Sequence, residues 1–184
     1  METNKPRIAV IYATAQGSTR EIAEYIAEDL ANRGADVEVA DAEHAPELSR
    51  FDAVVLGSAV HGMDYLPAAG QFVRDHRDAL AARDVWMFSV GVSAALRGPI
   101  GRRMARRVPQ KIATLRDSVG AKDFHAFAGH YERAGVSFGA RLRHRLLGGG
   151  RYGDLRDWAA ITAWTETIAR ALRLPQPRTS VIHP

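Results

Sequence analysis

Short apolar segments that alternate with stretches of helical periodicity constrain the fold of this chain more than any other feature. Residues 8–12 are continuously apolar, which is typical of a strand buried on both faces of a parallel sheet. In residues 21–32, apolar side chains recur at helical spacing, which predicts a helix with one buried face. Gly34 is positioned to end that helix. The start of the chain therefore predicts a strand–turn–helix unit.

The same alternation continues along the chain. Further strands are predicted over residues 37–39, 53–56, 85–90 and 124–128, and further helices over about 67–80, 100–119 with a break at Pro109, and 154–172. This order predicts one doubly wound α/β domain over residues 1–174, with a five-stranded parallel sheet and helices on both faces. A loose tail is expected over 175–184. Ligands of such sheets bind beyond the carboxyl ends of the strands, so the loops there are the candidate site.

A small-residue turn follows the first strand, with the sequence Thr14-Ala15-Gln16-Gly17-Ser18-Thr19. A helix N-terminus provides unpaired N–H groups and the positive end of the helix dipole, and hydroxyl side chains add donors. Gly17 lets the backbone approach an anion closely. The turn contains no lysine and matches neither GxxxxGK[ST] nor GxGxxG, so a monophosphate is favoured. The alternative is that Ser18 or Thr19 only caps the helix.

The Thr-x-x-Gly-x-Thr pattern after a first strand resembles the loop that holds the FMN phosphate in flavodoxins. Residues 57–62 resemble the loop that covers one face of the flavin ring, and residues 89–92 resemble the loop along the ring edge. The resemblance implies a flavodoxin-like fold and FMN as cofactor. It assigns FMN contacts to Thr14, Ala15, Gln16, Gly17, Ser18, Thr19, Ser58, Ala59, Val60, His61, Gly62, Ser89, Val90, Gly91 and Val92. Gln16 departs from the residues more common at its position.

Individual side chains in these loops carry more specific expectations. His61 occupies the position where flavodoxins often place an aromatic ring, and Tyr65 is close by in the sequence. We predict that His61 stacks on the flavin or transfers a proton. The resemblance also implies that backbone N–H groups near Gly91 and Val92 lie beside the pyrimidine end of the flavin. His125 is interpreted as structural, and no metal site is predicted because no metal-ligand spacing occurs.

Four stretches are more similar to the menaquinone-dependent protoporphyrinogen oxidase branch of the flavodoxin superfamily than to small electron-carrier flavodoxins. They are residues 19–23, residues 57–62 with Tyr65 and 72–76, residues 88–90 before a basic insert, and Ala128-Gly129 followed by Gly148-Gly149 and Asp157-Trp158. The resemblance implies an FMN-dependent oxidoreductase of heme biosynthesis, with a quinone as acceptor and a porphyrinogen as small-molecule donor. The alternatives are a flavodoxin-type electron carrier without its own substrate and a module that has lost FMN.

Positive charge is concentrated in one part of the chain. From residue 97 to residue 151 the net charge is +10, whereas the rest carries −6, and most of the cations fall in basic inserts at about 97–119 and 132–153. The arginines interpreted as facing substrate or membrane are Arg97, Arg102, Arg103, Arg106, Arg107, Arg141, Arg143 and Arg145. They suit an anionic membrane surface or the carboxylates of a donor, with a solvated basic face as the alternative. Nucleic acid is not expected, because no recognition motif is present.

Composition limits the chemistry. The chain has no cysteine, which excludes disulfides, thiolate nucleophiles and cysteine-ligated metal centres. The N-terminus lacks a signal-peptide pattern, and no apolar stretch has the roughly 20 residues that span a bilayer. We therefore expect a cytoplasmic protein, which can associate with the inner face of the cell membrane. Nothing in the sequence specifies an oligomeric state.

Overall fold

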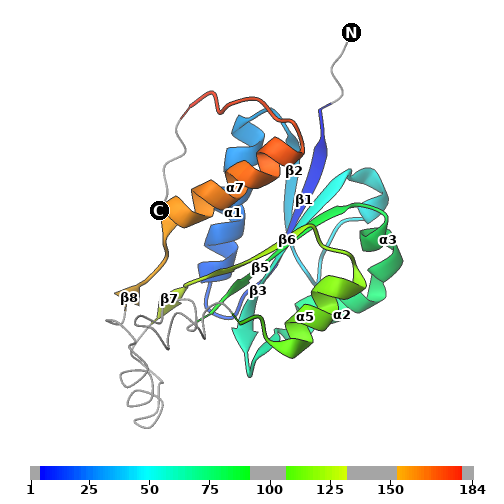
Figure 1. Ribbon diagram of the computed structural model, residues 1–184, viewed down its shortest axis with the longest axis vertical. Coiled ribbons are helices and arrows are strands. Elements are labelled where there is room, and N and C mark those ends of the chain that lie inside the picture. The colour runs from blue at the N-terminus through cyan, green and yellow to red at the C-terminus, as the bar shows by residue number, and fades with distance from the viewer. Residues whose placement is uncertain (1–4, 92–106, 132–152, 180–184) are drawn as a thin grey trace.

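A computed structural model describes residues 5–91, 107–131 and 153–179 (Figure 1). Five strands form a parallel sheet in the order β2-β1-β3-β5-β6, and β4 pairs antiparallel with β3. Their bounds are Arg7–Ala13 (β1), Asp36–Asp41 (β2), Ala53–His61 (β3), Asp64–Tyr65 (β4), Asp84–Val90 (β5) and Asp123–Phe127 (β6). The predicted five-stranded parallel sheet is confirmed, and its strand order is the one that flavodoxin-like folds use.

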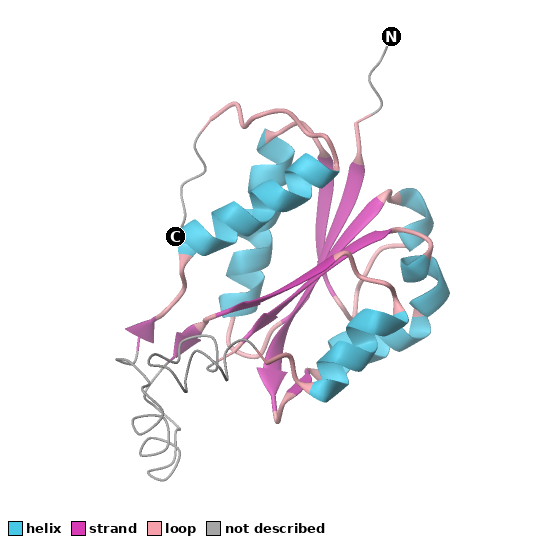
Figure 2. Cartoon of the chain, in the orientation of Figure 1, coloured by secondary structure: helices cyan, strands magenta, loops and turns pink. Residues whose placement is uncertain are grey.

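Helices cover both faces of the sheet (Figure 2). Helices α1 (Ser18–Asn32) and α7 (Trp158–Ala171) lie on one face, and α2 (Pro67–Asp75), α3 (Arg77–Ala81) and α5 (Gln110–Ser118) lie on the other. Alternate residues of one strand enter different cores: Ile8 and Val10 pack in the cluster with α1 and α7, whereas Ala9 and Ile11 pack in the cluster with α2. This period of two on a strand buried on both sides explains the continuous apolar runs in the sequence.

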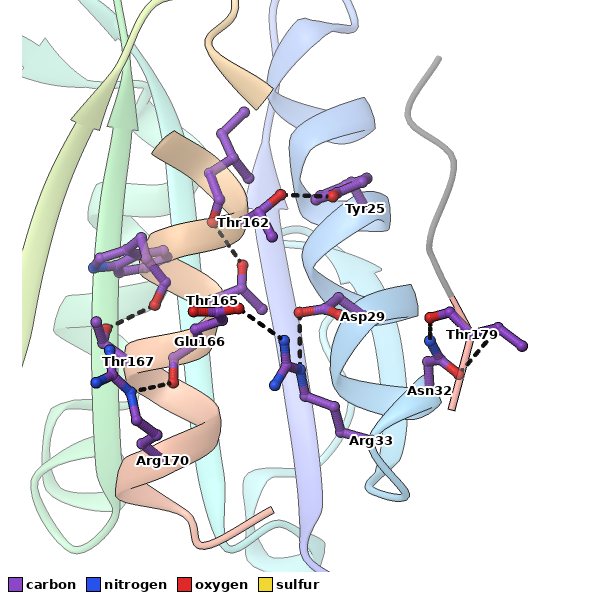
Figure 3. Close-up of polar contacts among 12 residues, drawn as sticks. Tyr25, Asp29, Asn32, Arg33, Thr162, Thr165, Glu166, Thr167, Arg170 and Thr179 are labelled. Atoms are coloured by element: carbon purple, nitrogen blue, oxygen red, sulfur yellow. Dashed lines mark hydrogen bonds and ion pairs between the residues drawn. The ribbon is translucent and has the colours of Figure 1, made fainter. Parts of the chain in front are cut away.

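Polar contacts join α1 to α7 (Figure 3). The hydroxyls of Tyr25 and Thr162 lie 2.7 Å apart, and Arg33 Nε lies 3.1 Å from Asp29 Oδ2 in a pair that is almost fully buried. Glu166 of α7 also approaches Arg33, at 3.8 Å. Removing one partner of a buried ion pair leaves an uncompensated charge, which is strongly destabilising. The Asp29–Arg33 pair lies within the end of α1, and the contacts of Tyr25 with Thr162 and of Arg33 with Glu166 join α7 to α1, the helix that begins at the predicted phosphate loop.

The end of the chain contacts α1, although the sequence predicts a loose tail. Asn32 donates to the carbonyl of Thr179, the Thr179 hydroxyl donates to Asn32 Oδ1 at 3.1 Å, and Arg178 N–H donates to the Asn32 carbonyl at 3.4 Å (Figure 3). The last turn of a helix has carbonyls without intrahelical partners, and the tail supplies one donor for them. Residues 178–179 of the predicted tail thus contact α1, although the described tail residues have no regular secondary structure.

Several helix and strand limits differ from the predicted ones, and three of these differences have a local structural cause. Strand β3 continues to His61 rather than ending at Leu56, because its residues pair with β5 as far as Val90 and with β4 beyond. The helix predicted over 67–80 is divided at His76, whose ring packs on Phe72 and approaches the Phe72 carbonyl at 3.0 Å. Helix α7 begins at Trp158 rather than near Asp154.

The late start of α7 has a local cause that the sequence pattern does not show. His130–Tyr131 (β7) and Gly153–Asp154 (β8) pair as antiparallel strands, so residue 154 is extended. The side chain of Asp157 then accepts from Ala160 N–H and caps the helix. Within residues 5–91, 107–131 and 153–179, no helix combines the length and the hydropathy needed to cross a bilayer.

Candidate functional site

The turn from β1 to α1 has the geometry of an anion-binding loop. Gly17 N–H donates to Thr14 Oγ1 at 2.9 Å, and Gly17 adopts a φ of 92°, a conformation that side chains disfavour. Gly17 is the N-cap residue, and no side chain caps α1. The alternative of helix capping by Ser18 or Thr19 is therefore wrong. The N-terminal N–H groups of α1 keep their capacity to donate to a ligand.

A buried hydroxyl in the first turn of α1 points to the same kind of ligand. Thr19 is fully buried, and in the described part of the chain its Oγ1 is the one buried side-chain polar atom without a hydrogen-bond partner. Buried polar groups are almost always paired, because leaving one unpaired costs about 1–3 kcal/mol. An unpartnered donor beside a helix N-terminus fits a phosphate that supplies the missing acceptor. Ala15 and Gln16 are exposed at the tip of this loop.

The loop after β6 lies against the phosphate loop. A Cβ added to Gly129 would lie 3.0 Å from Ser18 Oγ and 2.9 Å from Val90 Cγ1. Gly91 N–H donates to the Phe127 carbonyl at 3.0 Å. The structure thus brings together the carboxyl ends of β1, β5 and β6. Sequence reasoning did not include Gly129 among the site residues, although a glycine directly after a strand is a signal of close backbone approach.

The predicted ring-edge loop is only partly as expected. Ser89 and Val90 are buried at the end of β5, Gly91 is buried beside Val60, and Val92 lies outside the described residues. The Gly91 N–H donates to the Phe127 carbonyl, so the predicted contact of backbone N–H groups near Gly91 and Val92 with the flavin stays a prediction. A single N–H already bonded to backbone is a poor donor for a second acceptor.

The sequence suggests that residues 57–62 form a loop. In the structure, residues 57–61 belong to strand β3. Gly57 and Ser58 are buried inside β3. Ser58 Oγ donates to the Ala59 carbonyl at 2.9 Å and accepts from Leu66 N–H at 3.1 Å, so its hydroxyl holds the β3–β4 turn. Ala59 and Val60 are half-buried at the end of the strand. The part of this segment that is open to a ligand is therefore its end, at His61 and Gly62.

The tip of the β3–β4 hairpin is exposed beyond the sheet. His61, Gly62 and Met63 are exposed, Gly62 and Met63 have positive φ, and the Met63 side chain is 70% exposed. Tyr65 is buried instead: its hydroxyl donates to the Phe88 carbonyl at 2.8 Å, and burial raises its pKa. Tyr65 therefore fastens the hairpin to β5, and His61 and Met63 are the side chains that can meet a ligand. Sequence reasoning missed Met63, because a residue in a tight turn has no periodic signal.

Of the eight arginines predicted to face substrate or membrane, Arg107 is in the described part of the chain. It is exposed just before α5. The other seven, Arg97, Arg102, Arg103, Arg106, Arg141, Arg143 and Arg145, lie outside the described residues. Described residues next to both basic inserts show where those inserts join the domain. Gly91 lies at the carboxyl edge beside Val60, and Tyr131 pairs with Gly153 next to that edge.

His125 lies within β6 and is half-buried against Phe127, with ring centroids 4.5 Å apart. Burial lowers its pKa, so the folded protein binds a proton at His125 less readily than the unfolded chain. Its contribution to stability is present above about pH 6.5 and is lost as the pH falls through the lower folded-state pKa. We expect the melting temperature to fall more between pH 8 and pH 5 in the wild type than in His125→Asn. Equal falls in parallel calorimetric scans would contradict this.

Comparisons with known proteins agree with this geometry. Residues 9–147 match the family model of the flavodoxin domain. Protoporphyrinogen IX dehydrogenase (quinone) of Escherichia coli K12 is 29% identical over 103 residues, which are 55% of this chain. The match spans 53% of that relative, about half of its length.

Solved structures show the same fold. Rubredoxin oxygen:oxidoreductase from Desulfovibrio gigas aligns with a TM-score of 0.58 at 15% identity, over 92% of this chain and 37% of its own. A cysteine-to-serine mutant of a flavodoxin from Pseudomonas aeruginosa aligns with a TM-score of 0.55 at 16% identity, over 91% of this chain and 99% of its own. The predicted flavodoxin-like fold is confirmed. FMN is confirmed as the cofactor, because flavodoxin domains bind FMN.

Proposed function

This chain belongs to the flavodoxin domain family, and on that premise we propose that it is an FMN-dependent oxidoreductase that passes electrons from a small-molecule donor to a quinone. The observation that carries the proposal is the β1–α1 turn. There the N-terminus of α1 has no side-chain cap and the Thr19 hydroxyl has no partner, which supports binding of the FMN phosphate. The quinone and a porphyrinogen donor are supported by the name of the Escherichia coli relative.

FMN would be held at the carboxyl edge of the sheet by residues of four segments. Thr14, Ser18 and Thr19, with the backbone N–H groups of residues 15, 16 and 18, would bind its phosphate, while the Gly17 N–H holds the turn through Thr14 Oγ1. The end of the β3–β4 hairpin at His61 and Met63 would lie along the ring, and the Val90–Gly91 backbone with Gly129 would close the other side. Bound FMN supplies transfer of one or two electrons, while the protein places the cofactor and sets its electrostatic surroundings. His61 is the exposed titratable group that can hold or release a proton there.

The basic inserts would meet the anionic partner. Described residues that flank these inserts lie close to the carboxyl edge: Gly91 lies beside Val60, and Tyr131 pairs with Gly153. In this proposal the eight arginines named above would face that partner. Guanidinium groups pair bidentately with carboxylates such as those of a porphyrinogen, and they also favour an anionic membrane surface. A basic face beside the flavin would bring a membrane-dissolved quinone within reach.

Turnover tests the proposal directly. The purified protein, loaded with FMN and kept anaerobic, would be mixed with protoporphyrinogen IX and a water-soluble menaquinone analogue. We expect porphyrin fluorescence to rise only when the quinone and FMN are both present, since the electrons lost by the donor reduce the quinone. Protein that binds FMN tightly and yet gives the uncatalysed rate with this pair would overturn the proposed reaction and favour an electron carrier.

Membrane association has a separate test at Arg107. A cation near an anionic surface contributes about 1 kcal/mol, so Arg107→Gln should weaken binding to phosphatidylglycerol-containing vesicles about fivefold. Co-sedimentation with such vesicles, with pure phosphatidylcholine vesicles as reference, measures the effect. Arg173→Gln is the matched control, because Arg173 lies outside the proposed basic face and follows the far end of α7. Equal losses for both variants would mean that only net charge matters.

A further inference from the structure

Arg156 is a buried cation beside the phosphate loop that the proposed reaction does not use. Its side chain is only 7% exposed. Its Nε donates to Asp154 Oδ1 at 2.8 Å, its Nη2 to Asp154 Oδ2 at 2.7 Å, and its Nη1 to Glu21 Oε2. The guanidinium also lies over the ring of Trp158, 4.7 Å from the centroid. Arg156 is therefore held in place from several sides.

Two contacts place this arginine next to the proposed FMN phosphate site. Leu155 N–H donates to the Gly129 carbonyl at 3.3 Å, and Gly129 in turn lies against Ser18 of the loop. Glu21 is in the first turn of α1, where its N–H donates to the Gly17 carbonyl at 3.1 Å. Arg156 thus connects the segment after β6 with the turn of α1 that follows the phosphate loop.

Glu21 presents a problem for a phosphate at this helix end. A carboxylate in the first turn interacts favourably with the helix dipole when no ligand is present. A phosphate bound at the N-terminus uses the same positive end, and the two negative charges then repel each other. Arg156, a cation that Glu21 shares with Asp154, hydrogen-bonds the Glu21 carboxylate and offsets part of its negative charge. Its hydrogen bonds also keep the pKa of Asp154 below its usual range, and those to Asp154 and Glu21 raise the pKa of Arg156 itself.

We propose that Arg156 is a positioning residue for the FMN phosphate, which acts by offsetting the charge of Glu21 and holding that carboxylate to the side of the predicted phosphate loop. This inference rests on the proposed seating of the FMN phosphate at residues 14–19. Asp154 serves to orient the guanidinium from the opposite side. The consequence is selective: Arg156 supports binding of the phosphorylated flavin and has no effect on the ring system. It therefore makes the site prefer FMN to riboflavin.

The test compares the two flavins in the FMN-free protein. Dissociation constants for FMN and riboflavin would be measured by quenching of flavin fluorescence. In Arg156→Met we expect the Kd for FMN to rise about tenfold and the Kd for riboflavin to change less than twofold. In Arg156→Met with Glu21→Gln, the Kd for FMN should return to within about threefold of wild type. Arg20→Met is the matched control, because Arg20 is an exposed arginine of the same turn that pairs with Glu24.

Each outcome separates one explanation from another. A double variant as weak for FMN as Arg156→Met alone would overturn the inference, since Arg156 would then contact the phosphate or act only through folding. Equal losses for FMN and riboflavin would overturn it as well. If Arg156→Met does not fold, Glu21→Gln alone decides: FMN binding at least as tight as wild type supports the inference, and weaker binding overturns it. A wild-type protein with no preference for FMN would instead refute the phosphate loop itself, and the turnover assay reports separately on the proposed reaction.

Discussion

Replacing Thr19 with valine should stabilise the FMN-free protein and weaken its binding of FMN by about 10- to 100-fold. Valine matches threonine in shape, and it removes a buried hydroxyl that has no partner. Relief of that unpaired group is worth about 1–3 kcal/mol, and a hydrogen bond to a charged acceptor contributes about 1.5–3 kcal/mol to binding. The two effects have opposite signs. Without phosphate the unpaired hydroxyl lowers the stability of the protein, whereas with phosphate bound it donates a hydrogen bond that strengthens binding.

Thermal unfolding of the FMN-free protein and titration with FMN measure the two effects on the same sample. Thr165→Val is the matched control, because Thr165 is also fully buried but its hydroxyl donates to the Ile161 carbonyl at 2.9 Å. The control should gain no stability and should leave FMN binding unchanged. If Thr19→Val lowered the melting temperature and left the Kd for FMN as it is in wild type, Thr19 would be an ordinary core residue.

Gly57→Ala should destabilise the protein by about 3 kcal/mol or more, the largest single loss of stability that we expect. A Cβ at residue 57 would lie 1.9 Å from Phe88 Cζ and 2.3 Å from both Phe88 Cε atoms. The Phe88 ring is fully buried, with the rings of Phe127 and Trp164 at 5.8 Å and 5.9 Å. Because interiors are close-packed, the ring has no space into which to move, and overpacking costs about 1–3 kcal/mol or occasionally more.

Urea unfolding measures this loss, and two further variants establish its cause. Phe88→Leu in the Gly57→Ala background removes most of the clash, so the double variant should be more stable than Gly57→Ala alone. Gly70→Ala is the matched control in α2, where the added Cβ would meet the flexible end of Arg74 at 3.3 Å. Alanine is the better helix former, so this control should be neutral or slightly stabilising. A Gly57→Ala protein as stable as wild type would show that the ring can shift.

Local patterns were sufficient to predict the sheet and the turn that joins β1 to α1. Residues 8–12 are apolar throughout because both faces of β1 are covered, and the turn after them combines a glycine with hydroxyl residues at a helix start. Gly57 misled the interpretation for a physical reason. A glycine after an apolar run usually indicates the end of a strand. Gly57 instead lies in the middle of β3, where its lack of a side chain leaves space for the Phe88 ring of β5.

The parts that the sequence did not predict depend on partners far apart in the chain. Arg156 and Glu21 are separated by 135 residues, and neither has an unusual neighbourhood in the sequence. The pairing of Tyr131 with Gly153 likewise joins two short segments across a long insertion. Exposed residues in tight turns, such as Met63, carry no periodicity either. Such features are products of tertiary structure, and a single sequence contains no local pattern that reports them.

The short β7–β8 pairing also has a consequence for how such a protein can change over evolutionary time. His130 and Asp154 face each other across the pairing, and so do Tyr131 and Gly153, so the residues on either side of 132–152 lie side by side (Figure 1). The entropy of closing a loop grows only slowly with its length. Residues can therefore be gained, lost or exchanged between these two points at little thermodynamic cost to the domain. The pairing therefore allows the length and sequence of residues 132–152 to vary while the β1–β6 sheet and its helices are kept.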